Sequence, residues 1–485
     1  MRATGQLTIR FVLISAAVLF GSGMAQAVDR HWNVGSGLWS QSASWTPAAI
    51  PSGLDNAIID YFGATGGGFA RLTTPQVPAV TSVTITNSAT LTLSGSLTAG
   101  SLLVGDDVLV GANSFHGQLN ILSSSPFVVF TGGMTIVDQL RVGVLSGSGT
   151  VNQNAGTMIV GTKVVLGDSK DPFSTFNGGG VYYQSGGVLR TPELNVGSHV
   201  TATGSFNLSG GSLDVTDLYV GRSGVGVFNQ TGGISTPTQL RIGTNLVSPP
   251  PGTNTYNMNG GSLSTGATTI TKNGRFNYAG GSTWLGHLNL YENARVDING
   301  PGLQTYTMHY QPLNAPAMDA VIDIKGFGWD LGFTGFEQID EVMEGAGRGN
   351  NGGAWNGKGI ISSAAAANSG AAYKTGVGYA PGGIGLLIRH ALYGDTDVNG
   401  TVDINDFAKL AANFNATGRY WYHGDFDYNG TVNLADFGRF AANFNQSLPA
   451  LTARVEVPEP VCGLLAAAML LCRRRGSPVR RELLL

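Results

Sequence analysis

The chain has 485 residues, of which 42% are hydrophobic and only 12% are charged, and its formal net charge is −3 at pH 7. Such a chain is long enough to bury several hydrophobic cores. Because it has no basic patch, it is not expected to bind nucleic acid. Its only two cysteines, Cys462 and Cys472, lie near the C-terminus, so the body of the protein is predicted to contain no disulfide.

Residues 1–27 are predicted to be a signal peptide. Arg2 and Arg10 supply a positive start, residues 11–20 are mainly apolar, and Ala25-Gln26-Ala27 has the small–any–small pattern of a cleavage site. The apolar run is shorter than the roughly 20 residues that a transmembrane helix requires. We therefore expect the mature protein to begin at Val28 and to be exported.

Residues 28–99 are predicted to form a tryptophan-rich N-terminal cap followed by the first coils of a repeat. Trp32, Trp39 and Trp45 are closely spaced here, and the segment resembles the opening of exported repeat proteins of the autotransporter and PEP-CTERM kind. An exposed solenoid end is an edge at which chains aggregate, so these side chains are expected to cover it. Stacking on a sugar ring is the alternative role for the same tryptophans.

Residues 100–300 contain a degenerate repeat with a period in the twenties. An aromatic or apolar residue precedes Gly-Gly at 186–187, 210–211, 232–233, 260–261 and 280–281, and Leu-x-Val/Ile-Gly occurs at 140–143, 194–197, 218–221 and 240–243. Such a period without helical patterning indicates a solenoid of stacked coils. Each coil is predicted to have three short strands, with glycines at the corners. The chain is thus expected to be mainly β, as a parallel β-helix; an antiparallel β-sandwich is the alternative.

Residues 301–393 are predicted to form a C-terminal cap and bridging subdomain. Strands are expected over 319–324 and 385–388, and a short helix over 336–344. The glycine-rich stretch 352–363 resembles a spacer found before dockerin-like modules in exported planctomycete proteins.

Residues 394–447 contain two copies of one acidic pattern, thirty residues apart. The candidate metal ligands are Asp395, Asp397, Asn399, Thr401, Asp403 and Asp406 in the first copy, and Asp425, Asp427, Asn429, Thr431, Asn433 and Asp436 in the second. Oxygen-bearing side chains at loop positions 1, 3, 5, 9 and 12, with glycine at position 6, are the pattern of a Ca²⁺-binding loop. Two Ca²⁺ sites are therefore predicted. A pair of metal-free Asx-rich turns is the alternative.

Each loop is followed by an amphipathic helical pattern. Phe407, Leu410, Ala411 and Phe414 follow the first loop at helical spacing, and Phe437, Phe440, Ala441 and Phe444 follow the second. The two helices can bury these stripes against each other only when the loops are fixed. Folding of 394–446 is therefore expected to be coupled to Ca²⁺ binding.

The duplicated loop–helix segment resembles a dockerin, a module related to half an EF-hand. The resemblance implies Ca²⁺ binding at the positions above, with Asp406 and Asp436 as the twelfth-position ligands. It also implies docking onto a cohesin-like partner. At loop positions 10 and 11 this chain has Ile404-Asn405 and Leu434-Ala435, where cohesin-binding dockerins usually carry a hydroxyl pair.

The C-terminal residues are predicted to be a linker, 448–456, and a sorting tail, 457–485. Val457-Pro458-Glu459-Pro460 precedes an apolar run over 461–472 and three arginines at 473–475. This order resembles a PEP-CTERM sorting tail, which implies transient membrane association, proteolytic removal, and transfer to the cell surface or extracellular matrix. A disordered tail with a chance apolar patch is the alternative.

Many parallel β-helices cleave acidic polysaccharides, so a lyase or glycosidase is the main alternative to a structural role. Asp214 and Asp217 are the closest carboxylate pair in the repeat, but their odd spacing predicts opposite faces of a strand. Asp168 and Asp171 fall in an expected loop insertion, and Glu193 and Asp297 are expected to be isolated. No catalytic residue is therefore assigned.

We thus expect a non-catalytic structural or adhesion protein of the cell surface or matrix. A carbohydrate-binding component of a dockerin-type assembly is a further alternative.

Overall fold

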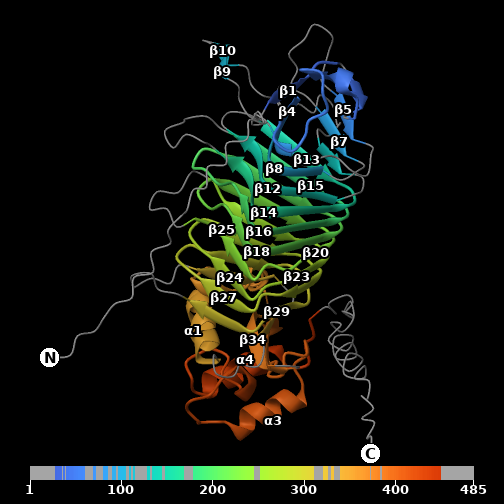
Figure 1. The fold of residues 1–485 in the computed structure, drawn as a ribbon. Helices are drawn as coiled ribbons and strands as arrows, with labels where there is room; N and C mark the ends of the chain where they lie inside the picture. Colours follow the sequence, from blue (N-terminus) through green and yellow to red (C-terminus); the bar gives the residue numbers. More distant parts are fainter. Residues whose placement is uncertain are drawn as a thin grey trace, which may run out of the picture.

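The structure is a computed structural model that describes residues 28–448, with interruptions. The residues within this range that it does not describe are 35, 39, 60–68, 73–79, 86–89, 94–96, 105–108, 111–112, 115–127, 131–133, 145–147, 169–177, 245–251, 311–319, 326–328, 332–338, 372 and 383–384. Figure 1 shows a rod of stacked coils, with β1 (Asp29–Trp32) at one end and the helices α3 (Ile404–Ala412) and α4 (Leu434–Asn443) at the other.

Two long sheets run along the rod. The first contains β1, β3 (Trp45–Thr46), β4 (Asn56–Ile59), β6 (Val80–Ile85), β8 (Leu97–Val104), β12 (Met134–Val144), β14 (Thr157–Asp168), β16 (Val188–Val196), β18 (Ser212–Val220), β20 (Ile234–Ser235), β21 (Gln239–Ile242), β23 (Ser262–Ser264), β24 (Ala267–Ile270), β26 (Ser282–Trp284), β27 (His287–Leu290), β29 (Leu303–Thr305), β30 (Thr307–Tyr310), β32 (Trp329–Leu331), β34 (Thr375–Gly382) and β35 (Gly385–Leu392).

The second sheet contains β2 (Ser36–Leu38), β5 (Phe69–Leu72), β7 (Thr90–Leu93), β11 (Val128–Phe130), β13 (Ser148–Gln153), β15 (Gly179–Gln184), β17 (Thr203–Leu208), β19 (Val225–Gln230), β22 (Asn254–Met258), β25 (Gly274–Tyr278), β28 (Arg295–Ile298), β31 (Val321–Ile324) and β33 (Gly359–Ile361). A separate hairpin pairs β9 (Leu109–Val110) with β10 (Asn113–Ser114).

Pairing between successive coils is parallel throughout the repeat, which confirms the β-helix and shows that the antiparallel sandwich is wrong. In the second sheet β17 pairs with β15 on one side and β19 on the other. In the first sheet the two halves of β18 pair separately with β20 and β21. A coil therefore has three strand segments, as predicted. The parallel pairing extends beyond residue 300, because β31 pairs with β28 and then with β33.

The interior of the rod holds a column of aromatic rings, one from each of several successive coils. Tyr182, Phe206, Phe228, Tyr256 and Phe276 occupy one register position and are all buried. The first three ring-to-ring distances along the column are 4.9, 4.9 and 4.5 Å, with nearly parallel planes. Each ring depends on those above and below it, so neighbouring coils stabilise one another.

Buried glutamine side chains form hydrogen bonds with the backbone at the corners of the coils. The side-chain nitrogen of Gln184 donates to the carbonyl oxygens of Gly187 and of Ser212 in the next coil, and Gln230 donates in the same way to Gly233 and Ser262. These amides thereby satisfy backbone groups where the chain turns.

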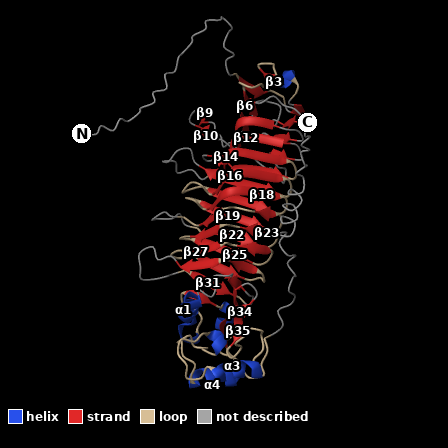
Figure 2. Cartoon of the chain, turned by 60° about the horizontal axis from the view of Figure 1, so that its bottom comes forward, coloured by secondary structure: helices blue, strands red, loops and turns tan. Residues whose placement is uncertain are grey.

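Figure 2 shows the strands as a continuous stack between the two ends of the rod.

Glycine is required at the corners because of the backbone conformation, and inside β17 because of close packing. The second residue of each Gly-Gly pair has a positive φ, as at Gly211 with +75°, a conformation that other residues rarely adopt. Gly204 instead lies against backbone, since a Cβ there would be 2.2 Å from the nitrogen of Gly197. The predicted role of the glycines is confirmed.

The N-terminal end of the rod buries two of the predicted tryptophans. The rings of Trp32 and Trp45 are 4% and 0% exposed and meet edge to face at 5.0 Å. They come from β1 and β3, which pair antiparallel, and the short helix η1 (Ser42–Ser44) precedes β3. Trp39 lies outside the described residues. The burial of Trp32 and Trp45 agrees with a capping role.

At the other end the coils give way to an antiparallel hairpin. β35 pairs with β32 and with β34, both antiparallel. In the described part of the chain between β32 and β34, the helices are α1 (Ile339–Asn350), η2 (Asn351–Gly353) and α2 (Ser363–Ala367). The strands expected over 319–324 and 385–388 correspond to β31 and β35, and the expected helix over 336–344 corresponds to α1, which begins at Ile339 and continues to Asn350. Residues 319 and 336–338 lie outside the described residues.

Candidate metal centre

Two loops with the same backbone geometry precede α3 and α4. The carboxylate of Asp395 accepts a hydrogen bond from the backbone N–H of Gly400 at 2.8 Å, and Asp425 accepts one from Gly430 at 2.9 Å. Both glycines have positive φ, +93° and +77°. The sixth-position glycine therefore makes the tight turn that the sequence pattern predicts.

Three aspartates converge in each loop. The triads are Asp395, Asp397 and Asp406 in the first loop, and Asp425, Asp427 and Asp436 in the second. Within each triad one oxygen of every carboxylate lies within 4.8 Å of the others, so each triad can hold a metal ion. Four of the six side chains belong to completely buried residues, and Asp397 and Asp427 are partly exposed.

Each twelfth-position aspartate accepts hydrogen bonds from residues of its own loop. One oxygen of Asp406 accepts from the backbone N–H and the hydroxyl of Thr396, at 2.8 and 2.6 Å, and the other accepts from the N–H of Asp403. Asp436 accepts from the N–H groups of Phe426 and Asn433 at 2.8 and 2.9 Å. These bonds fix the start of each helix to the start of its loop.

The ninth-position residues cap the helices. The side chain of Asp403 accepts from the N–H of Asn405 at 2.7 Å, and Asn433 accepts from Ala435 at 2.8 Å. A capping side chain satisfies a backbone donor that the helix leaves free. The structure thus uses Asp403 and Asn433 as N-caps, and Asp403 is not among the three carboxylates that converge in the first loop. In EF-hand loops the ninth position often reaches its ion through water.

The remaining predicted ligands lie at the turn itself. The side-chain oxygens of Asn399 and Asn429 each accept from the backbone N–H two residues on, at Thr401 and Thr431, both at 2.8 Å. At the seventh position of such a loop it is the backbone carbonyl that ligates the ion. Thr401 and Thr431 are therefore expected to contribute main-chain oxygen.

The electrostatics of the triads suit a divalent cation. Burial raises the pKa of Asp395 to about 8, and the charges of Asp406 and Asp397 act in the same direction. Burial likewise raises the pKa of Asp425 to about 7, with Asp436 and Asp427 adding to it. Ionised carboxylates therefore destabilise these sites unless a cation lies among them. All the donors are hard oxygen atoms, which are the ligands that Ca²⁺ and Mg²⁺ prefer.

Each helix packs against the glycine that precedes the opposite loop. A Cβ on Gly424 would lie 3.1 Å from the backbone and side chain of Leu410 in α3, and one on Gly394 would lie 3.2 Å from Phe440 in α4. Leu410 and Phe440 are buried, and the Phe407 ring lies 5.7 Å from that of Phe440. The two apolar stripes thus meet as expected, and each half of the module supports the loop of the other.

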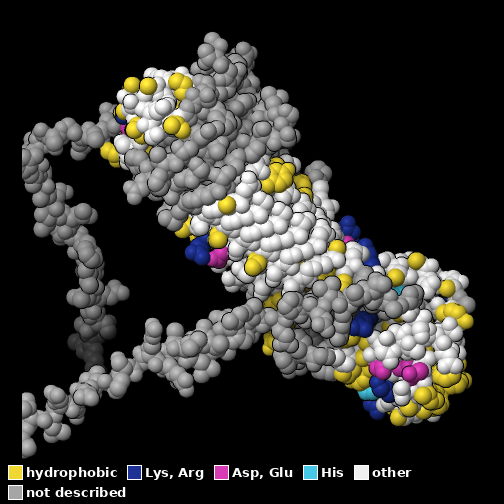
Figure 3. Space-filling view, turned by 90° about the vertical axis from the view of Figure 1, so that its right-hand side faces the viewer, with side chains coloured by type: hydrophobic (Ala, Val, Ile, Leu, Met, Phe, Trp, Pro, Cys, Tyr) yellow, Lys and Arg dark blue, Asp and Glu magenta, His cyan; other side chains and the backbone are white. Residues whose placement is uncertain are grey.

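The outer parts of the same helices leave apolar side chains uncovered. Those more than a third exposed are Ile404, Phe407, Phe414, Leu434, Phe437 and Phe444. Ile404 and Leu434, at equivalent positions of the two halves, are the most exposed, at 64% and 72%. Figure 3 shows hydrophobic side chains gathered at this end of the rod, whereas the described face of the coils has few.

The loop–helix module, residues 394–447, is bonded within itself and to the hairpin at the end of the rod. The indole nitrogen of the buried Trp421, in η3 (Trp421–His423), donates to the carbonyl oxygen of Asp395 at 2.6 Å. The hydroxyl of Tyr428 donates to the carbonyl of Val377 at 2.8 Å and accepts from its N–H at 3.2 Å. The amide of Asn443 donates to the carbonyl of Tyr393 at 2.7 Å. The first metal loop, the second loop and the β34–β35 hairpin therefore form one packed unit.

Sequence reasoning missed Trp421, Tyr428 and Asn443 because their partners lie 26 to 51 residues away. Neither repeats nor metal motifs signal such contacts. The one available signal was Trp421 itself, a large aromatic residue in the short segment between α3 and the second loop. Large buried aromatics commonly mark packing interfaces.

Carboxylates of the coils are ion-paired with basic side chains of neighbouring coils. The pairs are Asp168 with Arg141, Asp214 with Arg190, Glu193 with Arg222, Asp217 with Arg241, and Asp297 with Arg275. The exposed pairs among them are expected to contribute little free energy each. Their arrangement ties adjacent coils together across the surface. Asp171 lies outside the described residues.

Two expectations about coil carboxylates are wrong. Asp214 and Asp217 both face outward, because the alternation of faces restarts at the exposed Thr216, with Val215 and Leu218 both buried. The odd-spacing rule applies only to one straight strand.

Glu193 and Asp297 are not isolated. Glu193 pairs with Arg222 at 2.9 Å. Asp297 is 2% exposed and pairs with Arg275 and Arg295 at 2.8 Å and with Lys325 at 3.3 Å. Burial acts to raise its pKa, but these cations hold the pKa of Asp297 below its usual value. It is therefore a buried charge with its own counter-ions.

No protein-family model matches this chain, and no match was found among curated proteins or solved structures. Among the described residues, no helix is long and apolar enough to cross a membrane.

Proposed function

We propose that this chain is a non-catalytic structural or adhesion protein of the cell surface or extracellular matrix. In this proposal the β-helix is a rigid spacer and the C-terminal module is an attachment unit stabilised by two Ca²⁺ ions. The observation that carries the proposal is the presence of two equivalent aspartate triads in loops that are bonded to the end of the rod.

The triads are proposed to bind Ca²⁺ through Asp395, Asp397 and Asp406 and, thirty residues later, through the equivalent Asp425, Asp427 and Asp436. The loop spacing supports this choice of ion, since a twelve-residue loop with glycine at position 6 suits the larger and more flexible coordination shell of Ca²⁺. A bound divalent cation supplies positive charge that offsets the repulsion among the buried carboxylates. The residues themselves hold the loop ends and helix starts together.

The outer face of α3 and α4 is proposed to contact a partner protein of the cohesin type or another surface or matrix protein. The dockerin-like sequence pattern supports this, as do the exposed side chains of Ile404 and Leu434. Contiguous exposed apolar side chains commonly mark protein interaction surfaces. Because those two positions are hydrophobic, we expect an apolar contact in place of a hydroxyl-based one.

Export and surface transfer are proposed from the two chain ends, residues 1–27 and 457–485, which lie outside the described residues. The export signal, the sorting tail and the disulfide-free body are all consistent with one route, in which the chain is exported and then transferred to the cell surface. In that route the tail associates with the membrane transiently before it is removed.

Mass spectrometry of the protein isolated from its native cell surface tests this route. We expect the mature chain to begin near Val28 and to end near Val457, because both end segments carry processing signals. Recovery of the full chain, from Met1 to Leu485, from the cytosolic fraction alone would contradict the proposed location.

The ion pairs of the coils support a structural role for the rod. An inverting or retaining glycosidase needs two opposed carboxylates free to act on the sugar, and Asp214 and Asp217 are instead engaged by arginines. Incubation of the protein with acidic and neutral polysaccharides is therefore expected to release no unsaturated or reducing ends.

The matched variants for this assay are Asp214→Asn and Asp217→Asn, which remove the two outward carboxylates one at a time. We expect wild type and both variants to give the same background. Steady product release by wild type that either variant abolishes would show that the rod is an enzyme.

A further inference from the structure

The strand β34 lies at the C-terminal end of the first sheet. In the described part of the chain it pairs with β35 alone, so one of its two edges has no partner strand. Such an edge presents backbone N–H and C=O groups that can pair with another chain. Residues 375–380 of this strand are nevertheless all buried. The edge is therefore covered by something other than a strand.

Tyr428 of the second loop covers the middle of this edge. Its hydroxyl accepts from the N–H of Val377 at 3.2 Å and donates to the carbonyl oxygen of the same residue at 2.8 Å. Both groups of Val377 therefore point away from its partner His390 on β35, as in a non-hydrogen-bonded pair of an antiparallel sheet. One hydroxyl thus occupies both backbone groups that a further strand would use at this position.

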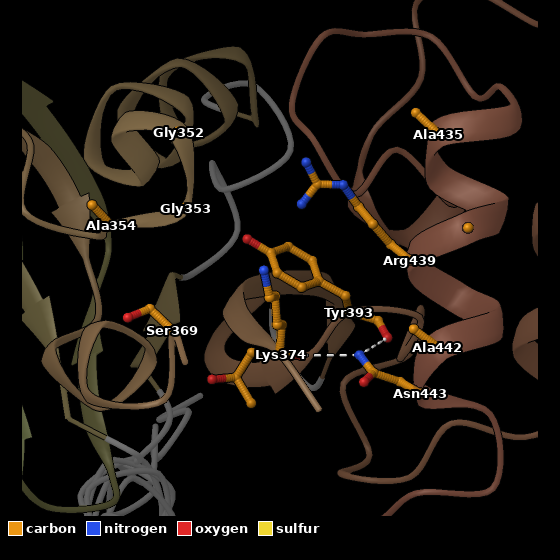
Figure 4. Close-up of a pocket in the computed structure, with 12 residues that line it drawn as sticks. Gly352, Gly353, Ala354, Ser369, Lys374, Tyr393, Ala435, Arg439, Ala442 and Asn443 are labelled. Carbon is orange, nitrogen blue, oxygen red and sulfur yellow. Dashed lines mark hydrogen bonds between the residues drawn. The ribbon is translucent and has the colours of Figure 1, made fainter. Parts of the chain in front are cut away.

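The loop–helix module also covers the open end of the hairpin. The amide nitrogen of Asn443, in α4, donates to the carbonyl oxygens of Lys374, just before β34, at 2.9 Å and of Tyr393, just after β35, at 2.7 Å. Figure 4 shows these two bonds as dashed lines. The indole of Trp421 packs on the strand itself, since a Cβ on Gly378 would lie 2.8 Å from its nitrogen. The module therefore takes the place of the next strand.

The internal duplication shows that the second half of the module carries these contacts. The residue of the first loop that corresponds to Tyr428 is Val398, which has no hydroxyl and accepts from Arg389 through its carbonyl at 3.2 Å. The residue that corresponds to Asn443 is Asn413, whose amide donates to the backbone of its own helix. Equivalent positions thus have different tasks in the two halves.

The position of Tyr428 depends on the second loop. Tyr428 lies between two of the predicted ligands, Asp427 and Asn429, and its φ is +63°. A residue other than glycine keeps a positive φ only where the surrounding structure imposes it. An ion bound to the second triad would impose it by fixing the loop. Loss of the ion is therefore expected to release Tyr428 from Val377.

β34 has little protection of its own. Edge strands are normally kept from pairing with other chains by charged side chains, bulges or proline. The sequence of β34 is Thr-Gly-Val-Gly-Tyr-Ala-Pro-Gly, without a charged residue and with its proline near the end. Two copies of this strand would meet no like charge, and identical strands can pair antiparallel about a twofold axis. A second copy of the chain is therefore the occupant that suits an open β34 edge.

We propose that the loop–helix module is a calcium-controlled cap on β34, and that without Ca²⁺ two copies of the chain pair through their β34 edges. The inference rests on the proposed binding of Ca²⁺ to the second triad. In the ion-bound form Tyr428 and Asn443 cover the edge and keep the chain monomeric.

Sedimentation velocity of the full chain tests the proposal. Wild type is expected to be a monomer in calcium and a dimer in chelator. Val377→Pro should remain a monomer in chelator, because proline removes the outward N–H and is tolerated on an edge strand. The matched control is Val377→Ala, which also loses the valine side chain but keeps the N–H, and it should dimerise in chelator as wild type does.

A second variant tests the cap in the presence of calcium. Tyr428→Phe keeps the buried ring and removes the hydroxyl, so it should still bind two ions while the amide hydrogen of Val377 exchanges about tenfold faster than in wild type. Tyr422→Phe makes the same change at a half-buried tyrosine of η3 and should leave that exchange unchanged.

Three results would count against the proposal. Wild type that binds two ions but stays monomeric in chelator would overturn it. Equal dimerisation of Val377→Pro and Val377→Ala would overturn the assignment to the β34 edge. Absence of Ca²⁺ binding by wild type would overturn the proposed function, and the calcium control with it.

Discussion

Phe228→Ala is expected to lower the free energy of unfolding of the rod by about 3–5 kcal/mol, the usual cost of removing a buried phenylalanine side chain. Phe228 is 0% exposed and lies in the middle of the aromatic column, 4.9 Å from Phe206 and 4.5 Å from Tyr256. Its loss leaves a cavity and also removes two ring contacts. Because each coil is stabilised by its neighbours, the effect should spread to the adjacent coils.

Urea unfolding followed by the β-sheet circular dichroism signal measures this change. The matched control is Tyr183→Ala, which alters an aromatic residue of β15, two strands away in the same sheet, whose side chain is 46% exposed. That variant is expected to change the free energy by less than about 0.5 kcal/mol. Similar losses in the two variants would contradict the view that the inner column, and not surface aromatics, holds the coils together.

Removing Ca²⁺ with a chelator is expected to destabilise the C-terminal unit while leaving the coils folded. At a calcium concentration about a hundredfold above the dissociation constant, each site contributes about 2.7 kcal/mol. The loss should appear in the near-ultraviolet signal, because Trp421 donates directly to the carbonyl of Asp395. The β-sheet signal of the coils serves as the internal control. Identical unfolding of the C-terminal unit in calcium and in chelator would contradict the coupling.

The pH dependence of this stability should change sign with calcium. In chelator, burial places the pKa of Asp395 near 8 and that of Asp425 near 7, above the roughly 4 of an unfolded aspartate. Between these values the unfolded state binds fewer protons, so stability falls as pH rises from about 4 to about 8. In calcium the ligands must be ionised to bind the ion, so stability should rise over the same interval. Thermal melts at several pH values measure both slopes.

The coils were largely predictable because their constraints are local. The Gly-Gly corners and the alternation in segments such as 203–208 are visible in the sequence, and the structure confirms them. The buried glutamines were not predictable, since a polar residue in an alternating strand is normally assigned to the outer face. Gln184 lies inside because its amide reaches the backbone of the next corner, a contact that depends on how the coils stack.

The candidate metal loops were also predictable, since all the ligands of one site lie within twelve residues. The attachment of the module to the rod was not. Tyr428 bonds to Val377 and Asn443 bonds to Tyr393 only because the hairpin folds back beside α4. For the same reason a boundary drawn at residue 394 marks a change of motif but not a break in packing.

Calorimetric titration of the metal-free full chain with Ca²⁺ tests the central claim most directly. The account predicts two bound ions for wild type and one each for Asp397→Ala and Asp427→Ala, which alter the least buried member of each triad. Absence of Ca²⁺ binding by wild type, or two ions still bound by either variant, would contradict it.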